Sequence, residues 1–369
     1  MRYFIISGER SGDLHASNLI KSIKEVDPNA ICKGMGGDLS ASQGMELVAH
    51  YNDVALMGFV EVLLGFRKVL KYLNLIKREL SGFKPDALIL VDYGGFNMKI
   101  AAYAKSQNIP VHYYIPPKVW AWNQSRALKL KTITDKIYAI LPFEPAFYAG
   151  FGMEVNYVGN PLLDEIRKFQ PHPFFHQKNH LNYSPIIALL PGSRKQELNN
   201  MLSVMLEVVK KFPSAQFVIA GVNNLDKQLY APALAAGIKV VFDQTYDLLH
   251  HANAAIVTSG TATLETALFR VPQVVVYKTS GISYSIAKRL IKVPYISLVN
   301  LIAEQKVVNE LIQSDYNVSK VAEELNQILS NVVYKGHMLQ GYDVVQEKIG
   351  EASASDTTAK FIVAAIQKA

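Results

Sequence analysis

The sequence predicts an α/β fold made of two domains, each with a parallel β-sheet covered by helices on both faces. Short apolar runs rich in valine and isoleucine alternate with amphipathic stretches along the chain, which is typical of such sheets. A chain of 369 residues exceeds one ordinary hydrophobic core, so two domains are expected. A polar, proline-containing segment without periodicity, Arg167–Ser184, interrupts the alternation and predicts a linker.

Each apolar run is long enough for one buried strand, and helix-like sequence lies between most of them. The runs in the first half are Tyr3–Ile6, Ala87–Val91, Val111–Ile115 and Ile137–Ile140. The runs in the second half are Ile186–Leu190, Phe217–Ala220, Lys239–Phe242, Ala254–Val257 and Val274–Tyr277. Successive βα units of this kind form parallel sheets.

Composition restricts the class of protein. The chain is 50% hydrophobic and 19% charged, which excludes a disordered chain. The single cysteine, Cys32, excludes an intrachain disulfide and fits a reducing cytoplasm. The apolar run at the N-terminus is too short for a signal peptide or a membrane span, so a cytoplasmic location is expected. A net charge of +7 favours an anionic partner, which could be nucleic acid, acidic lipid or a phosphorylated substrate.

Open α/β sheets bind ligands at the carboxyl ends of their strands, so the loops that follow the strands are the candidates for a site. In any single loop, tight turns explain the glycines and contact with solvent explains the charged residues. Five such loops, each after a strand, favour a ligand site. The loops are SGERSGDLHAS (Ser7–Ser17), DYGGFN (Asp92–Asn97), PPKVWAWNQSR (Pro116–Arg126), PGSRKQEL (Pro191–Leu198) and TSGTAT (Thr258–Thr263).

Small and hydroxylated residues fill the last of these loops. A helix that begins near Thr261 would present free backbone N–H groups and a positive dipole end to a phosphate. Gly260 would let the phosphate approach, and the carboxylate of Glu265 could accept two ribose hydroxyls. The alternative is that Thr261 is only an N-cap and that Glu265 only stabilises the helix dipole.

The loop PGSRKQEL predicts a similar anion site, with Arg194 as the cation. Together the two loops predict a nucleotide diphosphate bound by the second domain. Neither loop matches G-x-G-x-x-G or the P-loop pattern, which argues against a dinucleotide-binding dehydrogenase and against P-loop hydrolysis. No metal site is predicted, and the adjacent His250 and His251 would point apart on a helix.

A family resemblance rests on several segments in order. The chain resembles the lipid-A-disaccharide synthases over residues 3–330. The segments are SGERSGDLHAS, GMGG (Gly34–Gly37), MGFVEVL (Met57–Leu63), VWAW (Val119–Trp122), LPFEPAFY (Leu141–Tyr148), VGNPLLD (Val158–Asp164), LLPGSRKQEL (Leu189–Leu198), TSGTATLETAL (Thr258–Leu268) and SLVNLIAEQKVVNELIQ (Ser297–Gln313).

The resemblance implies a GT-B glycosyltransferase with two Rossmann-like domains facing across a cleft. Residues 1–165 would bind the acceptor, residues 166–339 would bind the UDP-sugar, and a C-terminal helix within about residues 340–369 would pack back on the first domain. The implied enzyme is inverting, needs no metal or other cofactor, and is associated peripherally with the inner leaflet of the cytoplasmic membrane. Nucleic acid is not among the implied partners.

The implied reaction transfers 2,3-diacylglucosamine from UDP-2,3-diacylglucosamine to 2,3-diacylglucosamine 1-phosphate through a β-1,6 link, with release of UDP. Another GT-B enzyme of UDP-GlcNAc, such as the transferase of lipid II synthesis or a UDP-GlcNAc 2-epimerase, is the alternative. Such an enzyme would share the fold and the nucleotide loops but is not expected to share SGERSGD and VWAW. An exported two-domain binding protein would need the signal peptide that this N-terminus does not resemble.

Asp92 is the predicted general base, because it ends a buried strand, where a carboxylate is otherwise costly. It is the only carboxylate of its loop, since Gly95 stands where the family often has a second acid. Glu9 and Asp13 on the neighbouring loop are the rival bases. The alternative for Asp13 is a helix N-cap.

The resemblance extends the predicted sites. Asn300, Glu310 and Gln313 match a family segment that faces the nucleotide, whereas core packing is the alternative for Trp120. The predicted donor-binding residues are Gly192, Ser193, Arg194, Ser259, Gly260, Thr261, Ala262, Thr263, Glu265, Asn300, Glu310 and Gln313. The predicted acceptor- or lipid-binding residues are Ser11, Met57, Leu63, Phe66, Leu70, Asn97 and Trp120.

Two helical segments have open interpretations. Val60–Leu80 is amphipathic and basic with apolar area outside its main face, which indicates either an interfacial membrane segment or a helix that only covers the core. Gly336 and Gly341 are expected to interrupt the helical pattern before a final helix in Ala359–Ala369. That helix is too short to be stable alone and must dock on the first domain, on its own domain, or on the second subunit of a homodimer.

Overall fold

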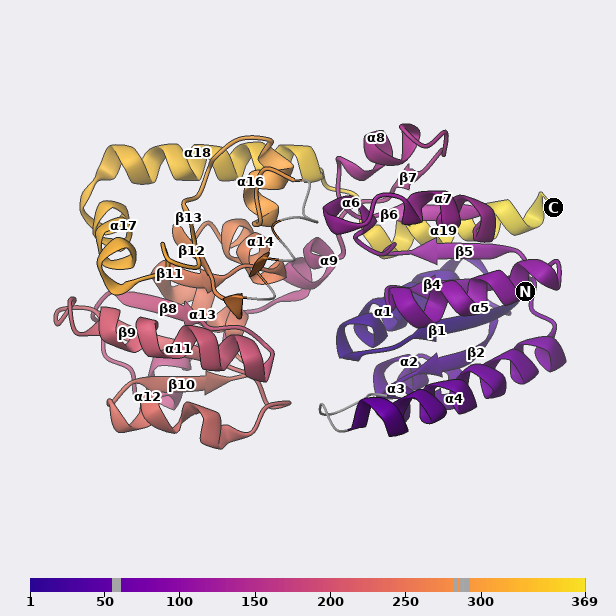
Figure 1. Cartoon of the computed structure of the whole chain (residues 1–369), viewed down its shortest axis with the longest axis horizontal. Helices are drawn as coiled ribbons and strands as arrows, with labels where there is room; N and C mark the ends of the chain where they lie inside the picture. Colours follow the sequence, from indigo (N-terminus) through magenta and orange to yellow (C-terminus); the bar gives the residue numbers. More distant parts are fainter. Residues whose placement is uncertain (55–60, 282–283, 286–287, 289–292, 369) are drawn as a thin grey trace. The chain divides into compact units, whose positions relative to one another are not determined.

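The computed structural model describes residues 1–54, 61–281, 284–285, 288 and 293–368, and the side chains of residues 61–66 lie outside the description. The chain forms two compact units, drawn in Figure 1. The first comprises Met1–Asp164 together with Glu351–Ala369, and the second comprises Glu165–Gly350. Each unit is built around one parallel sheet, so the predicted α/β class is confirmed.

The sheet of the first unit has seven parallel strands in the order β3-β2-β1-β4-β5-β6-β7. The strands are β1 (Arg2–Ser7), β2 (Ile31–Gly36), β3 (Met45–His50), β4 (Ala87–Val91), β5 (Val111–Tyr114), β6 (Lys136–Ala139) and β7 (Asn156–Tyr157). Apolar side chains on both faces explain why the central strands read as continuous hydrophobic runs.

Two layers of helices cover the two faces of this sheet. Tyr3 and Ile5 of β1 point toward α1 (Arg10–Val26) and α19 (Ala354–Gln367), whereas Phe4 and Ile6 point toward a second layer. The second layer contains α4 (Glu61–Phe83), α5 (Gly94–Ser106) and α7 (Arg126–Ile133). The shorter helices are α2 (Asp38–Ser42), α3 (Tyr51–Val54), α6 (Val119–Trp122), α8 (Glu144–Ala149) and α9 (Pro161–Lys168), which crosses the boundary between the units.

The sheet of the second unit has six parallel strands in the order β10-β9-β8-β11-β12-β13. The strands are β8 (Ile186–Leu190), β9 (Gln216–Gly221), β10 (Lys239–Phe242), β11 (Ala252–Thr258), β12 (Gln273–Tyr277) and β13 (Glu310–Ile312). The described helices include α10 (Phe175–Lys178), α11 (Lys195–Val209), α12 (Ala231–Ala235), α13 (Thr245–His251), α14 (Thr261–Leu268), α16 (Leu298–Ala303), α17 (Val318–Ser330) and α18 (Val332–Ile349), with a 3₁₀ turn at Lys227–Tyr230.

Two expectations from the sequence are wrong. The segment Arg167–Ser184 is not a bare linker, because Phe175 and Leu181 are buried in the core of the second unit. The helical pattern is not interrupted by glycine, because α18 runs through both Gly336 and Gly341. A Cβ atom at Gly341 would lie 2.3 Å from Cγ1 of Val307, so close packing explains this glycine.

The final helix lies in the first unit, and it begins earlier than the apolar pattern indicates. The chain joins that unit at Glu351, not near residue 340. α19 starts at Ala354 with Ser353 as its N-cap, and it packs against α1. The hydroxyl of Ser22 on α1 donates to Oδ1 of Asp356 at 2.6 Å. Within the described residues, none of the helices combines the length and hydropathy that a membrane span requires.

Candidate active site

Polar residues follow four neighbouring strands of the first unit at their carboxyl ends. β1, β4, β5 and β6 are adjacent and parallel, so the loops after them lie along one edge of the sheet. These loops carry Glu9, Asp92, Lys118 and Glu144. Glu9 and Asp92 were predicted site residues, whereas Lys118 and Glu144 were not, although Lys118 lies in the candidate loop Pro116–Arg126 and Glu144 in a segment that carries the family resemblance.

The backbone at Asp92 is held in an uncommon conformation. Asp92 and Tyr93 both have positive φ angles, 48° and 51°, in the left-handed region that costs energy for residues other than glycine. The carbonyl oxygen of Asp92 accepts two hydrogen bonds of 2.8 Å, from Nδ2 of Asn97 and from the hydroxyl of Tyr113. A Cβ atom at Gly8 would overlap the Tyr93 ring at 2.1 Å, so the loop after β1 closes directly on this turn.

The carboxyl group of Asp92 has a perturbed acidity. Burial and the neighbouring Glu9 carboxylate raise the pKa of Asp92 to about 6, and the Lys118 ammonium opposes this shift. The hydroxyl of Ser11 donates to Oε1 of Glu9 at 3.3 Å. Asp92 is therefore mostly ionised at neutral pH and is a stronger base than an ordinary carboxylate. The structure brings Glu9 and Asp92 together, as expected for loops that follow adjacent strands.

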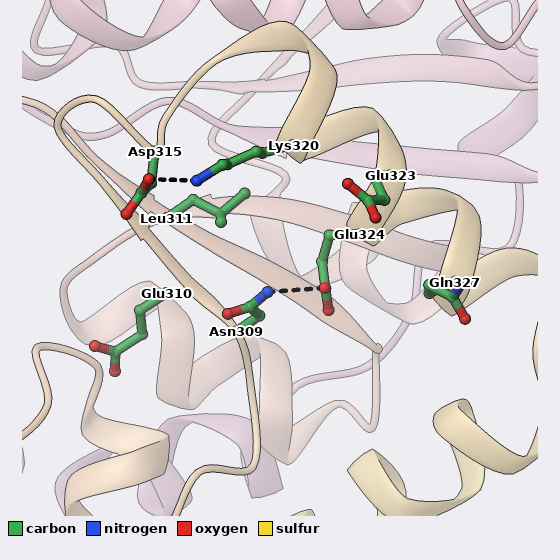
Figure 2. A pocket seen from close by; sticks show the side chains of 8 residues that line it. All are labelled: Asn309, Glu310, Leu311, Asp315, Lys320, Glu323, Glu324 and Gln327. Atoms are coloured by element: carbon green, nitrogen blue, oxygen red, sulfur yellow. Dashed lines mark hydrogen bonds and ion pairs between the residues drawn. The ribbon is translucent and has the colours of Figure 1, made fainter.

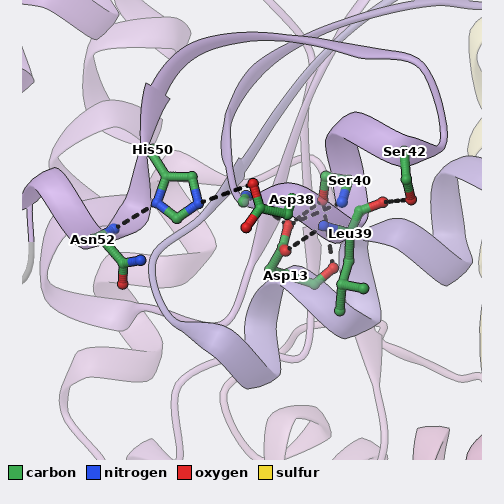
Figure 3. A network of polar contacts seen from close by, with 8 residues as sticks. Asp13, Asp38, Leu39, Ser40, Ser42, His50 and Asn52 are labelled. Atoms are coloured by element: carbon green, nitrogen blue, oxygen red, sulfur yellow. Dashed lines mark hydrogen bonds and ion pairs between the residues drawn. The ribbon is translucent and has the colours of Figure 1, made fainter. Parts of the chain in front are cut away.

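Asp13 lies apart from this pair and is engaged elsewhere. Figure 3 shows its carboxylate at the N-terminus of α2, where it accepts hydrogen bonds from the backbone N–H groups of Gly37, Leu39 and Ser40 and from the Ser40 hydroxyl. Asp13 lies inside α1, so it is not the N-cap of its own helix. A Cβ atom at Gly37 would lie 2.6 Å from Oδ2 of Asp13, which explains this glycine of the GMGG segment.

Glu144 is a buried carboxyl group that sequence reasoning missed. Its Oε1 accepts from Nε1 of Trp120 at 3.1 Å, and its Oε2 accepts from the backbone N–H groups of Ile140 and Leu141. Burial raises the pKa of Glu144 to about 7, against the effect of these hydrogen bonds and of Lys118. Trp120 is only 4% exposed, so the packing interpretation describes its environment better than an open acceptor site.

The expected phosphate loop of the second unit lies after β11. α14 begins at Thr261, as the sequence predicts, and its N-cap is Gly260. The hydroxyl of Thr263 donates to the Gly260 carbonyl at 2.8 Å, and the hydroxyl of Ser259 donates to the carbonyl of Ile296 at 2.9 Å. A Cβ atom added at Gly260 would meet nothing within 4 Å, so the space in front of this residue is open.

The loop after β8 is organised by Glu197, which sequence reasoning did not single out. Oε2 of Glu197 accepts the backbone N–H groups of Ser193 and Arg194, and Oε1 pairs with the Arg194 guanidinium at 2.9 Å. Gly192 has a φ of +112°, and a Cβ atom there would lie 2.5 Å from the Glu197 side chain. Two N–H groups that were expected to face a phosphate are therefore bonded within the loop. The Arg194 side chain remains 74% exposed.

Glu265 projects from α14 toward α13. Oε1 of Glu265 accepts a hydrogen bond of 2.9 Å from the hydroxyl of Tyr246. Burial raises the pKa of Glu265, and the Tyr246 hydrogen bond opposes that shift. One carboxylate oxygen is thus already occupied by a protein donor, which the expectation of two ribose contacts did not include.

Asn300 and Glu310 form a network with the backbone. Nδ2 of Asn300 donates to Oε1 of Glu310 and to the carbonyl of Val308, both at 2.9 Å. Oδ1 of Asn300 accepts from the backbone N–H groups of Val307 and Val308. Glu310 also accepts from the N–H groups of the two residues that precede α16. Asn300 is fully buried, so the hydrogen-bonding capacity of its side chain is used to fix the segment between α16 and β13.

Gln313, which directly follows β13, also binds the backbone. Its Oε1 accepts from the Thr279 N–H at 2.9 Å, and its Nε2 donates to the Thr279 carbonyl at 3.2 Å. These bonds join the loops that follow β12 and β13. Because β8, β11, β12 and β13 are neighbours, the loops with Gly192–Arg194, Ser259–Thr263 and Gln313 lie along the carboxyl edge of this sheet. Glu310, in contrast, begins β13, and Asn300 lies in α16 before it.

A polar pocket of about 360 Å³ lies beside the edge strand β13 and α17 (Figure 2). Glu310 is the only predicted site residue in its lining. Lys320 pairs with Asp315 at 2.5 Å, and Nδ2 of Asn309 donates to Glu324 at 2.9 Å. The facing polar groups therefore largely bind one another, and we assign no ligand to this pocket.

The predicted lipid-contacting residues are only partly described. Met57 lies outside the described residues, and the side chains of Leu63 and Phe66 lie outside them too. Leu70 is 39% exposed on α4, and Ser11 is exposed at the start of α1. Over the described stretches of the chain, no group of three or more histidine, cysteine or acidic side chains is placed to hold a metal ion.

Comparisons with solved structures place the fold. The UDP-GlcNAc 2-epimerase from Neisseria meningitidis bound to UDP-GlcNAc has a TM-score of 0.69 at 16% identity, with all of both chains covered. The calicheamicin glycosyltransferase CalG4 has a TM-score of 0.61 at 15% identity, covering 100% of this chain and 98% of that chain. At these identities the likeness shows the fold alone, which is the two-domain, Rossmann-like GT-B fold.

Sequence comparisons go further. The family description "Lipid-A-disaccharide synthetase" matches residues 3–362. The lipid-A-disaccharide synthase of Syntrophotalea carbinolica is 37% identical over 98% of this chain and 94% of the relative. That of Geobacter metallireducens is 36% identical over 100% of this chain and 98% of the relative. The family match over nearly the whole chain and these identities show that the chain belongs to the lipid-A-disaccharide synthase family of glycosyltransferases.

Proposed function

We propose that this glycosyltransferase moves 2,3-diacylglucosamine from UDP-2,3-diacylglucosamine to the 6-hydroxyl of 2,3-diacylglucosamine 1-phosphate. The products are a β-1,6-linked disaccharide 1-phosphate and UDP. Family membership supports the substrate class, and the basic carboxylate of Asp92 supports the chemistry. Residues of the first unit would act on the acceptor, and residues of the second unit would bind the donor.

In the proposed reaction, Asp92 takes the proton of the acceptor 6-hydroxyl as its oxygen attacks the anomeric carbon. The new C–O bond forms on the face opposite UDP, the bond from the anomeric carbon to the phosphate oxygen breaks, and its electron pair leaves with UDP. The anomeric configuration is therefore inverted. A carboxylate with a pKa of about 6 suits this step, because it is ionised near neutral pH and still basic enough to hold the proton.

Glu9 is proposed to support Asp92 and not to replace it. Its negative charge raises the pKa of Asp92, while Glu9 itself is an exposed residue at the start of α1. Asp13 is proposed to be structural, because four donors already bind its carboxylate. Of the three residues predicted as candidates for the general base, the proposal keeps Asp92.

The UDP-sugar is proposed to bind at the start of α14. The open space in front of Gly260 would admit a phosphate to the backbone N–H groups at the start of α14, where the helix dipole is favourable. The buried Thr258 hydroxyl, which has no hydrogen-bond partner among the described residues, is a further donor for this loop. The exposed guanidinium of Arg194 would add positive charge, and Glu265 would reach the ribose through its second oxygen.

Several predicted donor residues are proposed to act indirectly. Asn300, Glu310 and Gln313 hold the loops after β12 and β13 in place through their hydrogen bonds to the backbone. The proposed mechanism stabilises the leaving group with N–H donors and Arg194, so turnover should persist after EDTA treatment. The enzyme is proposed to work in the cytoplasm at the inner leaflet of the cytoplasmic membrane, where diacylated substrates reside, and a homodimer is a proposed assembly.

Mass spectrometry of lipids after incubation with both substrates tests the proposed function. The expected result is the disaccharide 1-phosphate with a stoichiometric amount of UDP, and proton NMR of the product should show the β anomer. Incubation with UDP-GlcNAc alone is the matched control for an epimerase. Formation of a 2-epimer there, with no disaccharide in the complete mixture, would refute the proposal.

A further inference from the structure

Lys118 is a cation at the carboxyl edge of the first sheet to which the proposed mechanism gives no role. It is exposed and directly precedes α6, in the loop that follows β5. Its ammonium group forms no ion pair or hydrogen bond with the residues that the structure describes. A solvated surface lysine would have the same exposure, so the surroundings of Lys118 decide whether it belongs to the site.

The fold packs the turn that carries Lys118 against the turn that carries Asp92. β4 and β5 are hydrogen-bonded neighbours, and the backbone N–H of Asp92 donates to the carbonyl of Tyr114 at 3.2 Å. A Cβ atom at Gly94 would lie 2.9 Å from Cβ of Pro117. The two turns are therefore in direct contact, and Lys118 follows Pro117 immediately.

The backbone on the other side of Lys118 is anchored in the core of the unit. Val119 and Trp120 are both buried. Nε1 of Trp120 donates to Oε1 of Glu144 at 3.1 Å, and the Trp120 ring meets the Phe143 ring edge-on, with centroids 4.9 Å apart. The backbone of Lys118 is thus held in place, while its exposed side chain can turn toward a ligand.

The charge of Lys118 acts on the candidate base without neutralising it. Burial and the Glu9 carboxylate raise the pKa of Asp92 to about 6, and the Lys118 ammonium opposes this shift. Lys118 and Asp92 nevertheless form no ion pair in the described structure. The positive charge beside the base is therefore available to a second anion.

The proposed acceptor brings such an anion into the site. In 2,3-diacylglucosamine 1-phosphate, C1 and C5 both bond to the ring oxygen, so the 1-phosphate and the 6-hydroxyl lie along the same edge of the sugar. We propose that the ammonium of Lys118 binds the 1-phosphate of the acceptor, selects phosphorylated acceptors and directs the 6-hydroxyl to Asp92. A flexible ammonium is a common ligand of phosphate. The inference rests on the proposed function for the identity of the acceptor.

Two acceptors and four chains test the proposal. The acceptors are 2,3-diacylglucosamine with and without its 1-phosphate, and the unaltered chain should show a higher kcat/KM for the phosphorylated one. Lys118→Ala should lower this preference about tenfold or more, because it removes a charged contact to the phosphate, whereas Lys118→Arg should keep most of it. An effect on the base alone changes both rates and cancels in the ratio. The matched control is Lys99→Ala, at an exposed lysine of α5, which should keep the full preference.

The pH profile separates phosphate binding from an effect on the base alone. Loss of the ammonium should move the inflection of kcat/KM to higher pH for both acceptors, since Lys118 lowers the pKa of Asp92. A shifted inflection with an unchanged preference between the acceptors would overturn phosphate binding by Lys118. An equal loss of preference in Lys99→Ala would overturn it as well.

The same assays distinguish this inference from the proposed function. If the unaltered chain forms no disaccharide from either acceptor, the proposed function fails and this inference fails with it. If the unaltered chain forms disaccharide from both acceptors with the same kcat/KM, the inference about Lys118 fails alone.

Discussion

Nδ2 of Asn97 donates a hydrogen bond of 2.8 Å to the carbonyl oxygen of Asp92, across the first turn of α5. The hydroxyl of Tyr113 binds the same oxygen. Both bonds hold a left-handed backbone that places the Asp92 carboxyl group beside Glu9. Asn97 was predicted as an acceptor-binding residue, but it is fully buried, and we now expect it to position the base.

Replacing Asn97 by alanine should therefore lower kcat and leave KM for both substrates nearly unchanged. The reason is that the variant loses one of two hydrogen bonds that fix Asp92 but loses no contact to a substrate. Steady-state kinetics separate the two parameters, and Asn97→Asp is a useful comparison because its carboxylate cannot donate to the Asp92 carbonyl. A large rise in KM for the acceptor in Asn97→Ala would contradict the positioning role and would indicate that Asn97 binds the acceptor directly.

Asp92→Asn should reduce turnover by a factor of about 10²–10⁴, because the amide keeps the shape of the side chain and cannot accept the proton. UDP affinity, measured by calorimetry, should be unchanged, since Asp92 belongs to the first unit. Asp38→Asn, at an exposed carboxylate in the same unit, is the control. If the folded Asp92 variant turns over at a near-normal rate, the base is another residue and Glu9 is the next to test.

Arg194→Ala should weaken UDP binding by about tenfold or more, because a hydrogen bond to a charged group contributes about 1.5–3 kcal/mol. Lys210→Ala is a matched control: Lys210 also forms an exposed i,i+3 ion pair with a glutamate, at the other end of the same helix. Calorimetry with UDP measures both variants. Equal affinities would mean that Arg194 only neutralises Glu197.

Asp13→Asn should destabilise the first unit by about 1–3 kcal/mol, because both carboxylate oxygens now accept hydrogen bonds and the amide keeps only one acceptor, so its NH₂ group must face a backbone N–H donor such as that of Leu39. The measurement is the shift of the denaturant midpoint, compared with Asp38→Asn in α2, the short helix whose N-terminus Asp13 binds. The proposed structural role predicts a large shift for Asp13 and almost none for Asp38. A normal midpoint combined with lost turnover would return Asp13 to the candidates for the base.

Most strands could be predicted because they are buried on both faces and therefore read as unbroken apolar runs. β2 was missed because its sequence, ICKGMG, is interrupted by lysine and glycine. The glycine has a physical cause in the fold: a Cβ atom at Gly34 would lie 1.8 Å from the carbonyl oxygen of Ile5 on β1, and the register with β3 shifts at this point. Such a contact between two strands leaves no periodic signal in the sequence.

In the candidate site, too, some features could be predicted from the sequence and others could not. Asp92 could be predicted, because a carboxylate at the end of a buried strand needs a reason to be there. Its pairing with Glu9 follows from strand adjacency, which sequence alone suggests only through the family resemblance. The partners of Asp13 and Arg194 could not be predicted, since a loop with free donors and a loop that binds its own carboxylate have the same composition.

The pH dependence of kcat/KM in the unaltered chain and in Glu9→Gln tests the central claim most directly. Asp92 must be ionised to accept the proton, so activity should rise with pH through an inflection near 6. Glu9→Gln removes a negative charge that raises the pKa of Asp92, so the inflection should move to lower pH. An inflection that stays in place in Glu9→Gln would contradict a base at Asp92 whose acidity is set by Glu9.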